Sequence, residues 1–246
     1  MAQTKWDEAE AAYRRAIALK PDCAEACCNL GSVLMRQARF DEAAAALNKA
    51  FDLFPATHPT REWARQQQQQ CQRFATLDAR LPAILRGMDK PANAAEQLDL
   101  AKLCVLKKNY TSAARFYRDA FTAKPELAEN VPPGTRYYAA CAAARAGCGQ
   151  GQDADTLPDK ERARWRRQAL EWLRQDLTWW GQALDKGDAR TKAEVRPRMR
   201  QWRIEGDLAG VRDKDALARL ADEERVQWER LWSDVDALLR RVGQPE

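Results

Sequence analysis

Five positions recur along this chain in the same order and with the same spacing. Each copy starts with an aromatic residue, which is followed by alanine after three residues, a large side chain after seven, alanine after ten and proline after fifteen. The copies are Trp6, Ala9, Tyr13, Ala16 and Pro21; Phe40, Ala43, Leu47, Ala50 and Pro55; and Tyr110, Ala113, Tyr117, Ala120 and Pro125. The central copy is offset by 34 residues from the first and by 70 from the third. A recurrence at this period predicts repeated structural units.

Residues 22–55 contain one complete unit, which we interpret as two short amphipathic helices. The first helix carries Cys27, Leu30, Gly31 and Leu34 on one face, and the second begins at Phe40 and ends before Pro55. Spacings of three and four residues place each set on a single helical stripe. Neither helix could bury its stripe alone, so the unit is expected to stack on copies of itself.

This 34-residue frame resembles the tetratricopeptide repeat. The resemblance implies an all-α solenoid of helical hairpins wound into a right-handed superhelix. The composition agrees, because strong helix formers dominate and β-branched residues are scarce. The first copy has its second helix only, so we expect that this chain is the C-terminal piece of a larger protein.

The array is expected to be irregular after its first complete unit. Residues 1–55 hold half a repeat and one full repeat, and 56–92 hold connecting helices, predicted at 60–77 and in a short helix that starts at Pro82. Residues 93–187 hold degenerate repeats with helices at 94–107 and 110–123, and the last repeat is split by a Gly- and Asp-rich loop at 148–159. Residues 188–246 are predicted to form a helical cap that completes a Trp-rich C-terminal region and ends with a helix at 222–241.

No catalytic, cofactor or metal site is expected. The sequence has no phosphate-binding loop, no dinucleotide glycine fingerprint and no kinase motif, and His58 is its single histidine. The seven cysteines contain no CxxC pair, so we interpret most of them as small core residues of a protein in the reducing cytoplasm. The loop sequence GQGQDAD at 149–155 has only a faint similarity to a calcium loop.

A basic segment offers a second interpretation, as a nucleic-acid-binding solenoid. Residues 160–203 contain 13 Lys and Arg against 6 Asp and Glu, together with five tryptophans. Such a segment could bind phosphates and stack bases. The tryptophans also fall on helical stripes, which suits core packing. Residues 204–246 are acidic, with 7 Lys and Arg against 11 Asp and Glu, so the two segments could instead complement each other.

A peptide-binding groove is the leading interpretation. In stacked repeats the first helices line the concave surface, and their outward residues select the ligand. The residues predicted to line it are Glu25, Cys28, Asn29, Ser32, Met35 and Arg36 in the complete repeat, and Leu98, Asp99, Lys102 and Leu106 in the next well-matched one. Asn29 resembles the asparagine that holds a peptide carboxylate in chaperone-binding tetratricopeptide domains. The lysine and arginine of that clamp are replaced here by Ala95 and Asp99.

Several longer segments resemble the C-terminal tetratricopeptide regions of large bacterial serine/threonine protein kinases. They are 81–104 (LPAILRGMDKPANAAEQLDLAKLC), 109–121 (NYTSAARFYRDAF), 137–147 (YYAACAAARAG), 157–177 (LPDKERARWRRQALEWLRQDL) and 207–239 (DLAGVRDKDALARLADEERVQWERLWSDVDALL). The kinase domain of that family has no counterpart here. The resemblance implies a scaffold that docks a protein or peptide partner for signalling, and we expect it to be non-enzymatic. No run of the sequence approaches the roughly 20 apolar residues that a membrane span needs, so we expect none in the chain.

Overall fold

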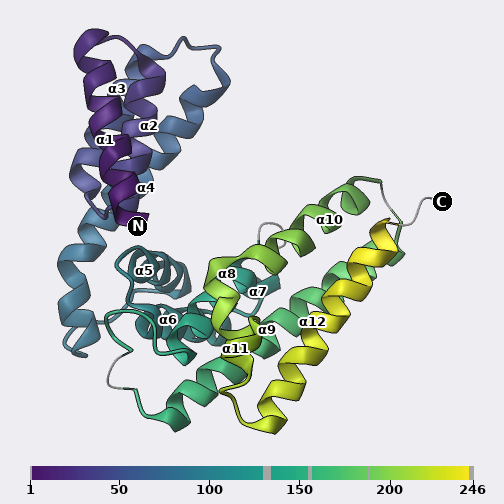
Figure 1. Cartoon of the computed structure of the whole chain (residues 1–246). Coiled ribbons are helices and arrows are strands. Elements are labelled where there is room, and N and C mark those ends of the chain that lie inside the picture. The colour runs from purple at the N-terminus through teal and green to yellow at the C-terminus, as the bar shows by residue number, and fades with distance from the viewer. Residues whose placement is uncertain (1, 130–133, 155–156, 188, 244–246) are drawn as a thin grey trace. The chain divides into compact units, whose positions relative to one another are not determined.

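In the computed structural model, the described residues contain helices and connecting turns and no strand (Figure 1). The structure describes all residues except 1, 130–133, 155–156, 188 and 244–246, and for 2–4, 129, 189–192 and 243 it describes the backbone alone. The chain divides into two compact units, Met1–Ala92 and Asn93–Glu246. The fold is the expected all-α arrangement of helical hairpins, with sequential helices packed against one another.

The first unit contains four helices in which each packs on the next. They are α1 (Ala2–Leu19), α2 (Ala24–Arg36), α3 (Phe40–Leu53) and α4 (Pro59–Leu85). Helices α2 and α3 form the predicted complete repeat and approach closely at Gly31, where an added Cβ would lie 2.5 Å from Leu47 Cγ. Small residues therefore do stand where the backbones meet, as the repeat frame predicts.

The repeat frame extends to the turns between paired helices. Ala38 joins α2 to α3 with a φ of 58°, and Lys108, 70 residues later, joins the next hairpin with a φ of 59°. The backbone N–H of Arg39 donates to the Leu34 carbonyl at 3.0 Å, and the N–H of Asn109 donates to the Cys104 carbonyl at 2.8 Å. The two turns thus share one hydrogen-bond pattern, in which a left-handed residue closes the first helix.

One helix boundary differs from the prediction. Residues 59–85 form the single helix α4, with Pro82 inside it, whereas the sequence predicted a break before that proline. Pro82 lies in the last turn, where a missing N–H removes one hydrogen bond to the residue four positions earlier. Leu77, Leu81 and Ile84 keep one buried stripe across this point, so packing holds the helix together.

The second unit begins with the predicted hairpin α5 (Ala94–Leu106) and α6 (Tyr110–Ala123), followed by the short α7 (Glu126–Glu129). Helices α8 (Thr135–Gly147) and α9 (Asp159–Asp185) then pack against each other, with a loop between them, in the region where a split repeat was predicted. The remaining elements are α10 (Ala189–Ile204), the 3₁₀ helix η1 (Gly206–Val211), α11 (Lys214–Leu217) and α12 (Asp222–Gly243). Of these, α12 packs against both α9 and α10.

Tryptophans form much of the core of the second unit. Six of the seven between 165 and 232 are buried, and Trp179 is half-buried. The buried ones are Trp165, Trp172, Trp180, Trp202, Trp228 and Trp232. Trp232 also donates its indole N–H to the Val211 carbonyl at 2.8 Å. Core packing therefore accounts for the density of tryptophan in this part of the sequence.

Candidate functional site

A stripe of polar side chains runs along the outer face of α2. Glu25, Asn29 and Arg36 are exposed, and Ser32 between them is half-exposed. The spacings of four, three and four residues place all four on one side of the helix. Arg36 lies over the Trp6 ring of α1 at 5.2 Å from its centroid, and Ser32 donates to the Cys28 carbonyl at 3.0 Å. We call these four residues the α2 face.

Two of the residues predicted for this surface lie elsewhere. Cys28 is buried, and burial raises the pKa of its thiol, so its side chain does not face outward as the groove prediction requires. Met35 is half-buried and packs against the core cluster of the first unit. Both deviate because the buried side of α2 is wide, since this helix packs against α1 as well as α3.

The four residues predicted on the next repeat lie on α5, in the second unit. Lys102 is exposed, and its ammonium forms an ion pair with Asp99 at 3.3 Å. Leu98 and Leu106 are half-buried. The predicted groove residues thus fall into two sets, one in each unit.

The cysteines and the single histidine make packing and hydrogen-bond contacts typical of structural residues. The seven cysteines are free thiols, five of them buried, and burial raises the pKa of Cys71 to about 11. His58 precedes α4, accepts the Thr60 backbone N–H at its Nδ1 at 3.2 Å and stacks on Phe54. Among the described residues, no three His, Cys, Asp or Glu side chains converge as metal ligands would.

The loop between α8 and α9 is anchored on α6 through Asp153. The Asp153 carboxylate accepts the backbone N–H groups of Thr111 at 3.1 Å and Ser112 at 2.8 Å. These are donors in the first turn of α6, which lack partners within the helix. Asp153 is therefore a helix cap supplied by a distant loop, and Asp155 of the calcium-like sequence lies outside the described residues.

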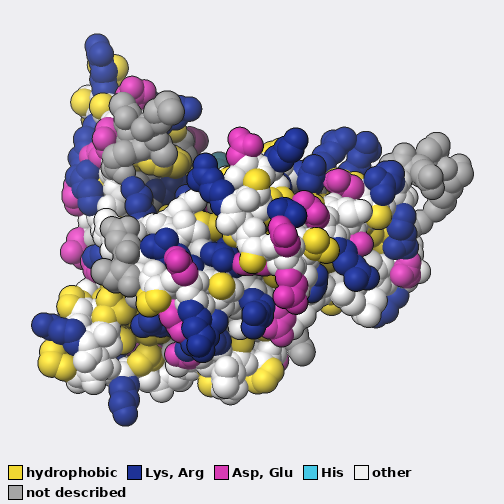
Figure 2. Space-filling model, turned by 60° about the horizontal axis from the view of Figure 1, so that its bottom comes forward, with side chains coloured by type: hydrophobic (Ala, Val, Ile, Leu, Met, Phe, Trp, Pro, Cys, Tyr) yellow, Lys and Arg dark blue, Asp and Glu magenta, His cyan; other side chains and the backbone are white. Residues whose placement is uncertain are grey.

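The charges of the basic segment are partly neutralised within the unit. Arg166 of α9 forms an ion pair with Glu224 of α12, with Nε to Oε1 at 2.5 Å, and Arg203 of α10 pairs with Asp236 at 3.3 Å. Arg241 also pairs with Asp185. The Arg166 and Arg203 pairs join the basic segment to the acidic one, whereas the Arg241 pair has the opposite polarity, with its arginine in the acidic segment. In Figure 2, Lys and Arg side chains are interspersed with Asp and Glu on the visible face.

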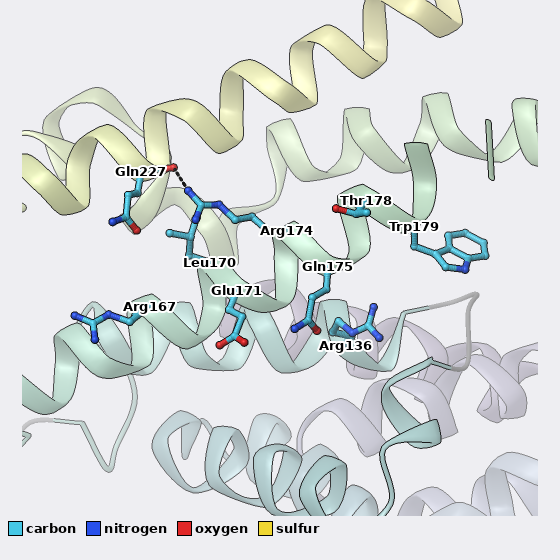
Figure 3. Close-up of a pocket in the computed structure, with 9 residues that line it drawn as sticks. All are labelled: Arg136, Arg167, Leu170, Glu171, Arg174, Gln175, Thr178, Trp179 and Gln227. Atoms are coloured by element: carbon cyan, nitrogen blue, oxygen red, sulfur yellow. Dashed lines mark hydrogen bonds between the residues drawn. The ribbon is translucent and has the colours of Figure 1, made fainter. Parts of the chain in front are cut away.

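A polar groove with a volume of about 1040 Å³ runs along α9 (Figure 3). Helix α9 supplies most of its lining, α8 supplies Arg136 and α12 supplies Gln227. The lining residues, which together we call the α9 groove, are Arg136, Arg167, Leu170, Glu171, Arg174, Gln175, Thr178, Trp179 and Gln227. Arg174 donates from Nη2 to the Gln227 carbonyl at 3.2 Å, which links the two sides of the groove.

Arg136, which lines the α9 groove, belongs to a buried ion pair with Asp176 of α9. Arg136 donates from Nη1 to Asp176 Oδ1 at 2.9 Å, and their exposed fractions are 9% and 5%. Burial raises the pKa of Asp176 to about 6, against the opposing effect of the Arg136 guanidinium. The pair joins α8 to α9.

The basic segment is evident in the sequence, but the residues of the α9 groove within it are not. The signal was present in the spacing of Arg167, Glu171, Arg174 and Thr178, which is four, three and four residues and marks one polar stripe. The neighbouring apolar stripe of tryptophan and leucine is the stronger pattern in this helix, so the polar stripe is easily missed in the sequence. Arg136 could not be found in this way, because it lies on another helix.

Comparison with known families agrees with the hairpin geometry of the first unit. Residues 1–56 match the family model described as a tetratricopeptide repeat. The match covers α1, α2 and α3. Proteins built from tetratricopeptide repeats generally act as scaffolds for protein interactions. A comparison with curated proteins finds no match for this sequence. Among the described residues, no helix has both the length and the apolar character needed to cross a membrane.

Proposed function

We propose that this protein is a non-enzymatic scaffold that binds a protein or peptide partner through the α2 face. The observation that carries this proposal is the stripe of Glu25, Asn29, Ser32 and Arg36 on a helix whose other faces are buried. The Asn29 amide forms no hydrogen bond with the described side chains, so its donors and acceptor are open to a partner's backbone.

The chemistry of the α2 face suits an extended peptide or a helix. An amide, a carboxylate and a guanidinium provide hydrogen bonds and charge, while Trp6 beneath Arg36 supplies an apolar edge. Surfaces that combine a rigid helix with such side chains recognise peptides through a few anchoring contacts.

Photo-crosslinking tests this proposal in extracts of the source organism. A photoreactive phenylalanine analogue at Ser32 is expected to capture a defined partner, and the same analogue at Asn48, exposed on α3, serves as the control. Replacing Asn29 and Arg36 by alanine should reduce capture at position 32 severalfold. Equal capture at both positions, or capture that survives the double substitution, would contradict the proposal.

We further propose that this partner belongs to a protein phosphorylation system. The resemblance of five segments to the C-terminal regions of bacterial serine/threonine kinases supports this. Mass spectrometry of the crosslinked product is expected to identify a kinase or a kinase substrate. A partner without any link to phosphorylation would limit the proposal to scaffolding.

A further inference from the structure

Arg167 and Arg174, two arginines of the α9 groove, flank the Glu171 carboxylate on one face of α9. Arg167 and Arg174 are exposed, and neither forms an ion pair with the described residues. They are seven residues apart on one face of α9, so their Cα atoms are separated by about 10 Å along the helix axis. The groove therefore presents two cationic positions with a fixed spacing.

The backbone of α12 restrains one of these cations. Arg174 donates from Nη2 to the Gln227 carbonyl, which leaves its other N–H groups available (Figure 3). A guanidinium restrained before binding loses less side-chain entropy when it contacts a carboxylate. This makes Arg174 the more preorganised of the two positions.

The space between the cations is neutral or acidic. Glu171 lies between Arg167 and Arg174 on the same face and accepts a hydrogen bond from Gln168 at 3.3 Å. Gln175, Thr178 and Gln227 also line the groove, and their side chains can bond the amides of a peptide backbone. A ligand with a negative charge at its centre would be repelled by Glu171, whereas one with charges at two separate points would not.

These features favour a peptide over a nucleic acid. A phosphate backbone places a charge at every nucleotide and gains from exposed aromatic faces. In the groove a carboxylate lies between the cations, and its one aromatic residue, Trp179, is half-buried and packs edge-on against Trp180.

We propose that the α9 groove binds an acidic peptide segment through two carboxylates, one at Arg167 and one at Arg174. An extended peptide advances about 3.1 Å per residue and repeats its facing every three residues. Two acidic residues separated by two others therefore match the spacing of the arginines. The intervening residues, which lie over Glu171, must be uncharged or basic.

Fluorescence anisotropy with the full chain tests this assignment. The probe is a labelled, C-terminally amidated peptide of about twelve residues that contains two glutamates separated by two residues. A peptide with glutamine in their place is the ligand control. The double variant Arg167→Gln, Arg174→Gln should bind the acidic peptide about tenfold more weakly, because two exposed ion pairs are lost.

Glu171→Gln is the decisive variant. It should bind the acidic peptide about two- to threefold more tightly, since it removes a repelling charge, whereas damage to the fold would weaken binding. The variant Arg200→Gln, Arg219→Gln removes the same charge from exposed positions of the second unit outside the groove, and it should bind as the wild type does.

Three outcomes would overturn the assignment. They are the absence of binding at millimolar peptide, an equal loss in the Arg200/Arg219 variant, and tighter binding of a single-stranded RNA of similar length that depends on Arg167 and Arg174. The last would make the groove a nucleic-acid site. The crosslinking at Ser32 concerns other residues in the other unit, so either proposal can fail without the other.

Discussion

At the scale of single residues, glycine determines how closely the paired helices approach in the second unit. A Cβ added to Gly147 of α8 would lie 2.8 Å from both the Arg162 carbonyl oxygen and the Arg166 backbone nitrogen of α9. Arg166 also donates from Nη1 to the Gly147 carbonyl at 2.7 Å. Because the obstacles include backbone atoms, a side chain at this position would have to separate the helices.

Gly147→Ala is therefore expected to lower the free energy of unfolding by about 1–3 kcal/mol, the usual cost of overpacking. Gly181, in the interior of α9, has no atom within 4 Å of an added Cβ. The matched variant Gly181→Ala should be neutral or stabilising by up to about 1 kcal/mol, because alanine favours the helix. Urea denaturation measures both. Equal effects of the two substitutions would contradict close approach at Gly147.

The carboxyl of Asp176 makes the second unit sensitive to pH. Its pKa is raised to about 6 by burial, above the ordinary value of 3.8. The folded chain therefore binds this proton more tightly than the unfolded chain. The contribution of Asp176 to the free energy of unfolding is therefore lowest above pH 6 and rises as the pH falls through 6 towards the unfolded value of 3.8.

The variant Asp176→Asn isolates this contribution, because the asparagine side chain is similar in size to aspartate and does not titrate. The free energy of unfolding of the wild type, relative to that of the variant, should increase between pH 7 and pH 4. Denaturant titrations across this range measure the difference. A difference that decreases as the pH falls would show that the Arg136 guanidinium outweighs desolvation and keeps the carboxyl ionised.

At the scale of the elements, the loop between α8 and α9 takes over the capping of α6. Asn109 precedes this helix but forms no side-chain cap, and the Asp153 carboxylate accepts the first N–H groups instead. Gly151 permits this approach, with a φ of 102° and a hypothetical Cβ 2.5 Å from the Lys108 carbonyl. The loop is thus part of the packing of the second unit.

Asp153→Ala should lower the free energy of unfolding by about 1 kcal/mol, the typical loss for a helix cap. The matched variant Asn109→Ala should have a smaller effect, since that side chain bonds no backbone N–H of the helix. Thermal denaturation by circular dichroism compares them. A larger effect at Asn109 would show that the nearby residue caps α6 in solution.

The parts of the fold that follow most directly from the sequence are the local, repeated ones. The frame of Phe40 and Tyr110 predicted the hairpins and their boundaries, because periodic apolar residues determine which helix faces are buried. It was wrong at Pro82, where the buried stripe of a long helix outweighs the preference of proline for a helix start. It also placed Cys28 on the surface, since a single stripe does not show that α2 packs on two sides.

At the scale of the whole molecule, the fold class could be predicted and the α9 groove could not. The fold follows from repeated local patterns. The groove depends on bringing together Arg136 of α8, Arg174 of α9 and Gln227 of α12, which are far apart in the sequence. The packing of the C-terminal helices brings these residues together, and because those helices follow no repeat, their packing cannot be predicted from the repeat frame.

The core cluster of the first unit consists of residues from that unit, and this predicts how a core substitution spreads. Leu47 is fully buried in the cluster that holds α2, α3 and part of α4 in the first unit. Leu47→Ala should cost about 2–5 kcal/mol there, through lost burial and a cavity. Leu19→Ala removes the same atoms from a side chain that is 82% exposed, so it should cost little.

Hydrogen exchange followed by mass spectrometry resolves the effect along the chain. With Leu47→Ala, amide protection should fall in peptides from residues 1–92 and stay close to the wild-type level in peptides from 93–246. With Leu19→Ala, both regions should keep their protection. Because local opening follows the free energy of the cooperative unit that contains each amide, a uniform loss over both regions would show that the chain unfolds as one cooperative unit.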